Sequence, residues 1–315
     1  MPSSSVRTFS YPDQYAAAIR GAEVELTVTR RGGFTAKITR IDFHRLWMQR
    51  FEESAPRIFY ASLAPGRVFF TFLTEPCPEV LTYGAPMPSD GIVCHGIADE
   101  FYQCSSGTVR RGAVSLPVAD MAALELAITG SHCAPRREPK VLIPPPAALA
   151  RFHRLHAAAG RLAEEAPEMI EHPEAARGLE QALVGALVGC FENRDARDEK
   201  SARRHHDAIM RRFSRVVEEG LDRALYLPEL CAALGVSDRT LRTCCHEHLG
   251  MGPKRYLLLR RLHLAHRALR EAVWGATTVT EVATRFGFWE LGRFAGAYRA
   301  LFGEAPSATL RRPPS

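Results

Sequence analysis

The sequence of 315 residues lacks any long hydrophobic run. No stretch approaches the roughly 18 consecutive apolar residues of a membrane-spanning helix. Residues 1–10 hold one arginine and no apolar segment of secretory length. These two absences argue against a membrane or secreted protein and predict a cytoplasmic one.

Paired cysteines and short histidine motifs are also missing. The eight cysteines include no C-x-x-C pair and no zinc-finger spacing, and most have apolar neighbours, so we expect reduced thiols that pack as small hydrophobic groups. His44, His95 and His132 are scattered and lack the His-x-His spacing of a metal-binding barrel, which predicts structural or surface roles. We therefore expect no metal, no cofactor and no catalytic residue.

Positive charge is present, and it is concentrated in the last third of the chain. From residue 201 onward, 19 Lys and Arg stand against 11 Asp and Glu, a formal charge of +8, whereas residues 1–200 sum to −2. A domain that neutralises DNA phosphates needs such an excess of positive charge, although a domain that binds an acidic protein would have it as well. Charge alone leaves both partners open.

The first 117 residues have the pattern of short β-strands. Residues 24–30 alternate between apolar and polar side chains, and Gly32-Gly33 then predicts a hairpin turn into a second strand. Further short apolar or β-branched runs, separated by proline and glycine, occupy residues 57–63, 67–73, 91–96 and 111–116. This half therefore predicts a small barrel or jelly roll.

Helical spacing replaces this alternation after Pro117. It predicts helices over residues 120–128, 147–166 and 174–191, with three prolines at 144–146 dividing the region. The last helix carries one apolar stripe, formed by Leu179, Leu183, Ala186, Leu187 and Cys190. Both core packing and a dimer interface fit this stripe. Residues 193–206 carry dense mixed charge and almost no apolar side chain, which predicts a linker between domains.

A first helix-turn-helix unit is predicted after this linker. Residues 227–235 have helical spacing and end at Gly235, and Ser237 is a good N-cap for a second helix that extends to about His248. Leu241, Cys245 and Leu249 form the inward face of this second helix. Its outward face consists of Arg239, Arg242, Thr243 and His246.

The same pattern recurs about fifty residues later. Residues 279–286 form a short helix, Gly287 makes the turn, and a second helix extends from about Glu290 to Leu301. Its buried face is predicted to contain Phe294, Tyr298 and Leu301. The exposed N-terminal end, which such proteins insert into the major groove, contains Trp289, Glu290, Leu291, Gly292 and Arg293.

A long basic helix over residues 253–272 is expected to join the two units as a rigid spacer. If both reading helices enter successive major-groove turns on one face of DNA, they lie roughly 34 Å apart. Two such units around a basic helix are a much more specific signal than one.

The C-terminal region resembles the DNA-binding domain of the AraC/XylS family of bacterial regulators over residues 207–312, about a third of the chain. The resemblance is carried by Gly250, Pro253-x-x-Tyr256, Arg261-Leu262-x-x-Ala265, Gly287-Phe288, Phe294, Tyr298 and Phe302-Gly303-x-x-Pro306-Ser307. It implies base contacts through Arg239, Arg242 and Thr243 in the first unit. In the second unit it implies Glu290, Leu291, Gly292, Arg293 and Gly296.

Two departures limit this transfer. Cys231 stands where a small alanine is usual, and Gly292 and Gly296 leave the second reading helix with few polar side chains, so we expect it to read fewer bases. Arg239, Arg242 and Arg293 are suited to bidentate contact with guanine, while phosphate contact remains an alternative for Arg242 and Arg293.

The resemblance also implies an α+β, two-domain molecule. Residues 1–192 form a cupin-like β barrel, β-rich to about 117 and helical over 118–192, which senses a small-molecule effector, mediates dimerisation, or both. Residues 207–315 bind double-stranded DNA. We expect a homodimer that activates transcription through RNA polymerase, with repression left open; no residue identifies an effector.

Two other classes of function compete with this one. An enzyme fused to the DNA-binding domain, such as an alkyl acceptor or a metal-dependent barrel, is disfavoured because the acceptor motif Pro-Cys-His-Arg is absent and the chain has Val93-Cys94-His95-Gly96. A module that binds another regulator instead of DNA fits the charge equally well. Competition by a specific DNA sequence would separate DNA binding from this last possibility.

Overall fold

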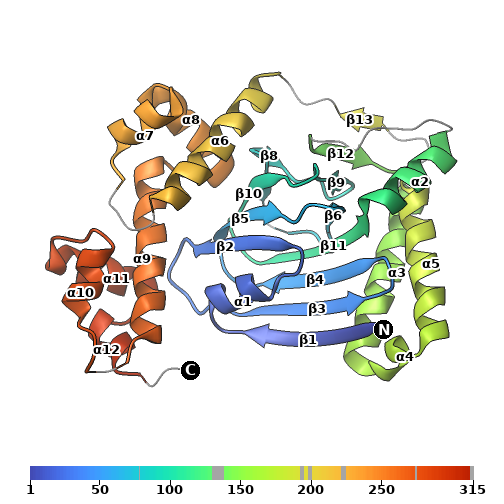
Figure 1. The fold of residues 1–315 in the computed structure, drawn as a ribbon, viewed down its shortest axis with the longest axis horizontal. Coiled ribbons are helices and arrows are strands. Elements are labelled where there is room, and N and C mark those ends of the chain that lie inside the picture. Colours follow the sequence, from blue (N-terminus) through green and yellow to red (C-terminus); the bar gives the residue numbers. More distant parts are fainter. Residues whose placement is uncertain are drawn as a thin grey trace.

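The computed structural model describes residues 1–77, 79–129, 138–191, 195–197, 201–220, 225–273 and 275–312. Its N-terminal half contains two antiparallel sheets with helices beside them, and its C-terminal third is helical (Figure 1). This confirms the predicted α+β architecture. The ladders between described strands form two separate sheets and do not close into one barrel.

All strand pairs among the described residues are antiparallel. One sheet has the order β1 (Ser3–Phe9), β3 (Ala36–Asp42), β4 (Trp47–Glu53), β11 (Val109–Pro117), β6 (Arg67–Leu73), β9 (Ile92–Cys94), β12 (Lys140–Ile143), β13 (Asp195–Arg197). The other has the order β2 (Ala22–Val28), β5 (Arg57–Leu63), β10 (Glu100–Ser105), β7 (Val80–Thr82), β8 (Ala85–Pro86). Phenylalanines from both sheets, such as Phe51 and Phe59, meet in the core between them.

The predicted hairpin around Gly32-Gly33 is wrong. Strand β2 pairs with β5, whereas β3 pairs with β1 and β4, so the chain crosses from one sheet to the other. Alternation identifies which face of a strand is buried, but it does not choose the partner strand. Leu26 on β2 and Ile38 on β3 therefore pack in a common core without pairing.

Helices cover the outer face of the larger sheet (Figure 1). They are α2 (Val118–Thr129), α3 (Pro146–Glu165), α4 (Glu168–Glu171) and α5 (Pro173–Gly189), while α1 (Pro12–Ala18) lies beside β2. The apolar stripe of α5 packs with Phe70 and Phe72 of β6 and Phe152 of α3. Of the two interpretations of this stripe, core packing is the one that the structure shows.

The C-terminal helices are α6 (Ser201–Glu219), α7 (Leu227–Leu234), α8 (Asp238–Leu249), α9 (Pro253–Glu271), α10 (Val279–Arg285), α11 (Leu291–Phe302) and α12 (Pro306–Leu310). The segment predicted as a linker, 193–206, contains β13 and the first residues of α6; residues 193, 194 and 198–200 lie outside the described ranges. The proposed domain limits stay a prediction. No helix in the described ranges is both long and apolar enough to cross a membrane.

Candidate nucleic-acid interface

The first helix-turn-helix unit consists of α7 and α8. Gly235 ends α7 in the left-handed conformation, with φ of 65°, which glycine adopts without a Cβ penalty. Ser237 caps α8, because its side chain accepts a hydrogen bond of 3.1 Å from the backbone N–H of Thr240. The predicted helices and their turn are confirmed in this unit.

The outward face of α8 contains the four residues that the sequence placed there. Arg239, Arg242, Thr243 and His246 are all exposed. Leu241, Cys245 and Leu249 are buried on the opposite face, as their spacing predicts. The four candidate DNA contacts therefore share one accessible surface.

Intrahelical contacts hold part of this surface in place. The Nε of Arg242 donates to both carboxylate oxygens of Asp238, at 2.9 and 3.0 Å, and this hydrogen bonding raises the pKa of Arg242. The hydroxyl of Thr243 donates to the carbonyl of Arg239 at 3.0 Å. The Arg242–Asp238 pair lies in solvent, where such a pair is weak. DNA phosphates or base edges can therefore replace Asp238.

The second unit consists of α10 and α11. Thr278 and Glu281 form a capping box at the start of α10: Thr278 accepts from the backbone N–H of Glu281 at 3.2 Å, and Glu281 accepts from that of Thr278 at 2.7 Å. Gly287 makes the turn with φ of 75°. The predicted helix, turn and helix are confirmed here as well.

The N-terminal half of α11 presents the second candidate set to solvent. Glu290, Leu291, Gly292, Arg293 and Gly296 are all exposed. Phe294, Tyr298 and Leu301 are buried against the rest of the domain. Arg293 pairs with Glu290 through two nitrogens, at 3.0 and 2.9 Å, and so repeats the arrangement of Arg242 with Asp238.

Helix α9 connects the two units and packs against both. Its N-terminal half packs in a core with α6 and α8, and its C-terminal half packs in a core with α10, α11 and α12. Arg261 donates to the carbonyl of Gly287 at 3.3 Å, and its guanidinium lies 4.9 Å from the ring centroid of Phe288. These contacts attach the turn of the second unit directly to the spacer helix.

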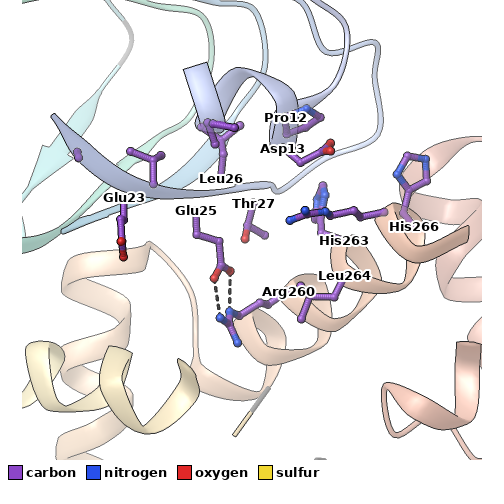
Figure 2. A pocket seen from close by; sticks show the side chains of 15 residues that line it. Pro12, Asp13, Glu23, Glu25, Leu26, Thr27, Arg260, His263, Leu264 and His266 are labelled. Carbon is purple, nitrogen blue, oxygen red and sulfur yellow. Dashed lines mark hydrogen bonds and ion pairs between the residues drawn. The ribbon is translucent and has the colours of Figure 1, made fainter. Parts of the chain in front are cut away.

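Helix α9 is also attached to the N-terminal half of the molecule. Figure 2 shows the Arg260 side chain on α9 directed at Glu25 on β2. The two residues share two hydrogen bonds of 2.6 Å, and Arg260 also donates to the carbonyl of Val217 at 3.0 Å. Burial would lower the pKa of Arg260, but the Glu25 carboxylate outweighs burial and raises it. Arg270 donates to Asp13 of α1 at 2.6 Å.

These attachments were not predictable from the sequence. Glu25 and Arg260 are 235 positions apart, and no local pattern relates them. A cavity of about 400 Å³ lies between β2 and α9, lined in part by Glu23, Glu25, Arg260, His263 and His266 (Figure 2). Acidic and basic groups line it together, and the surroundings of these residues do not identify an effector.

The scattered histidines have no common site in the described part of the chain. His44 is exposed, and His132 lies outside the described residues. His95 is buried, with Nε2 2.8 Å from the Thr71 hydroxyl and Nδ1 2.7 Å from that of Tyr83. Within the described ranges, no three His, Cys, Asp or Glu residues are grouped so that they could hold a metal ion.

Known bacterial regulators are similar in sequence to the C-terminal region. The model of a helix-turn-helix domain family matches residues 230–312. The XylDLEGF operon transcriptional activator 1 of Pseudomonas putida is 42% identical over 103 residues, which are 32% of this chain and 31% of that protein. The probable thc operon regulatory protein of Rhodococcus erythropolis is 30% identical over 151 residues, 48% of this chain and 46% of that protein.

A solved structure shows the same kind of likeness. A probable AraC family transcriptional regulator from Rhodopseudomonas palustris CGA009 shares 34% identity, and the alignment covers 34% of this chain and 99% of that chain, with a TM-score of 0.31. The chain spans about a third of the length of this Pseudomonas putida activator and just under half of the length of the Rhodococcus erythropolis protein. These relatives are named as regulators of transcription rather than as enzymes, in agreement with the expected class of protein.

Proposed function

We propose that this chain is a member of the AraC/XylS family, which its C-terminal double helix-turn-helix region resembles, and that it is a transcription regulator that reads two adjacent major-groove segments of DNA. The observation that carries this proposal is the exposure of two reading helices, α8 and α11, on a common spacer helix. Each has a buried apolar face and an outward face at its N-terminal half. Helices presented in this way fit the major groove.

The arginines supply the polar part of the proposed readout. Arg239 has no ion pair within the described residues, whereas Arg242 and Arg293 each exchange a carboxylate on their own helix for DNA when they bind. A bidentate contact between arginine and guanine contributes about 1–3 kcal/mol of discrimination. Thr243 and His246 complete the first reading face, and Glu290 and Leu291 contribute to the second.

The proposed regulation has two parts, activation of transcription and control by the N-terminal half. The protein acts in the cytoplasm as an activator that contacts RNA polymerase, since the Pseudomonas putida relatives are named transcriptional activators. Residues 1–192 pair two subunits and respond to a small-molecule effector. The ion pair between Glu25 of β2 and Arg260 of α9 supports this role, because it is a direct contact between the N-terminal half and the spacer helix.

Selection from a random duplex library with the full-length protein tests the proposal. We expect enrichment of a site with two blocks about one helical turn apart. At the same salt concentration, Arg239→Ala should weaken the base preference in the first block, and Arg293→Ala should weaken it in the second. Arg151→Ala is the matched control, because it removes an exposed arginine from α3 and should leave both blocks unchanged.

Three outcomes count against the proposal. Absence of DNA binding by the full-length protein, with and without cell extract as a source of effector, excludes DNA as the partner. Binding without any enriched sequence excludes specific readout. Displacement of DNA by an acidic protein, with no preference between the selected duplex and a scrambled one, favours the protein-interaction module.

A further inference from the structure

The second reading helix presents an apolar surface where a polar one is usual for base readout. Trp289, directly before the N-cap of α11, is 71% exposed, and Leu291, its first residue, is 41% exposed. Large apolar side chains in solvent are costly unless a partner covers them. On α8 the corresponding face consists of Arg239, Arg242 and Thr243. The two reading helices therefore differ in chemistry.

Two glycines extend this difference. Gly292 and Gly296 are one helical turn apart on the face opposite Phe294 and Tyr298, and both are exposed. Beyond the chain neighbours and the backbone of the same helix, a Cβ atom built on either glycine meets no atom within 4 Å. Neither has a positive φ, so neither packing nor backbone conformation requires glycine there. Glycine is nonetheless among the least favourable residues inside a helix.

Charge on the surrounding surface indicates what covers the apolar pair. Arg285, Arg293 and Arg299 are exposed on α10 and α11. Arg293 is the one basic residue among residues 289–296, so few side chains at this end of the helix can hydrogen-bond to bases. Basic side chains around an apolar patch complement a polyanion that offers an apolar group. In the major groove, the thymine 5-methyl is such a group.

We propose that α11 recognises thymine, through contact of Leu291 and Trp289 with 5-methyl groups in the major groove. Gly292 and Gly296 allow the helix backbone to approach the base edges closely, because no side chain separates them. The inference rests on the proposed function and specifies its second block. That block contains at least one thymine whose methyl group contributes to affinity.

The experiment compares thymine with deoxyuridine, which differs by the methyl group alone. In the duplex selected by the full-length protein, deoxyuridine replaces each thymine of the second block, which is the block where Arg293→Ala weakens the base preference. We expect affinity to fall about fourfold for each recognised methyl group that is removed, the factor that corresponds to burial of one such group. The same replacement in the block that Arg239→Ala relaxes is the DNA control.

Leu291→Ala completes a double-mutant cycle with the DNA replacement. The variant should bind the thymine and deoxyuridine duplexes with nearly equal affinity. Because Leu291 is exposed, the thermal unfolding midpoint of the variant should stay close to that of the parent protein. Gly292→Ala should weaken binding to the selected site. Gly185→Ala, an equally open glycine of α5, should leave DNA binding unchanged.

Different results separate this inference from the proposed function. Failure to enrich any site removes the proposed function, and with it the basis for the inference. An enriched site that binds equally well with deoxyuridine in the second block overturns the inference alone. So does a Leu291→Ala variant that keeps full DNA affinity but loses activation of transcription, because the apolar pair would then contact a protein.

Discussion

Single buried side chains of the N-terminal half have charge states determined by their surroundings. Glu53 accepts hydrogen bonds from Tyr15 and Arg57 and forms an ion pair with Arg111; burial opposes its ionised form, but Arg57 and Arg111 keep its pKa below the usual value. His156 of α3 lies against the rings of Phe72 and Phe152, and burial lowers its pKa to about 3. The first group is held charged and the second neutral.

The neutral state of His156 predicts a loss of stability in acid. Between about pH 6.5, where an exposed histidine titrates, and about pH 3, the unfolded chain binds a proton that the folded chain does not. The contribution is therefore complete above the unfolded pKa and falls as the pH falls. We expect His156 to lower the free energy of unfolding by about 2 kcal/mol between pH 7 and pH 5.

Urea unfolding of the full chain at these two pH values measures this effect. His156→Phe, or His156→Leu if the phenylalanine does not fold, should reduce the difference between the two pH values. His44→Phe replaces an exposed histidine and should leave that difference as it is. A pH dependence unchanged in both His156 variants would contradict the assignment.

At the scale of helices and turns, side-chain caps define where α8 and α10 of the DNA-binding region begin. Ser237 caps α8, and Thr278 with Glu281 caps α10, while glycines in the left-handed conformation end α7, α8 and α11. Each cap satisfies backbone groups that a helix end leaves without a partner. Helix α8 of the first unit and α10 of the second therefore depend on local contacts that a single substitution removes.

Removing either cap should cost stability. Ser237→Ala and Thr278→Ala should each lower the free energy of unfolding by about 1 kcal/mol, because a backbone N–H is then left without its acceptor. Thr280→Ala is the control, since Thr280 is an exposed residue of α10 that does not provide the cap. Denaturant unfolding of the three variants checks this. Equal stability of Thr278→Ala and Thr280→Ala would show that the capping box contributes nothing.

Across the whole molecule, the DNA-binding region and the β-rich half share a hydrophobic core. Tyr60 and Tyr102, on β5 and β10, pack with Phe213 of α6 and Tyr256 of α9. The rings of Tyr102 and Tyr256 are 6.1 Å apart and nearly perpendicular. The first helix-turn-helix unit is thus built partly on the N-terminal sheet, whereas the second packs with α9 and α12.

This shared core predicts coupled unfolding. Tyr102→Ala should lower stability by about 3–5 kcal/mol, as expected for a large aromatic residue removed from a core. It should lower the temperature at which both the β-sheet and the helical circular dichroism signals are lost, because side chains of both halves surround the space that the ring leaves. Calorimetry with circular dichroism measures both, and Tyr226→Ala, at a 60% exposed tyrosine, is the control. A helical transition that stays in place while the β signal shifts would refute the coupling.

Local information in the sequence was enough to predict the elements and their buried faces. The spacing of Leu241, Cys245 and Leu249, and of Phe294, Tyr298 and Leu301, determines which side of each reading helix faces inward, because a helix repeats every 3.6 residues. Glycine and serine at the turns set the helix limits through backbone conformation and capping. The exposure of Arg239, Arg242 and Arg293 follows from the same periodicity.

Tertiary structure alone decided which segments meet. The partner of β2 is β5 rather than β3, and Glu25 contacts Arg260, although neither choice leaves a local pattern. Alternation is the same for every possible partner strand, and an ion pair between distant positions depends on how the sheets and α9 pack. The attachment of the spacer helix to the N-terminal half is therefore a property of the folded molecule, decided by packing and charge across its whole length.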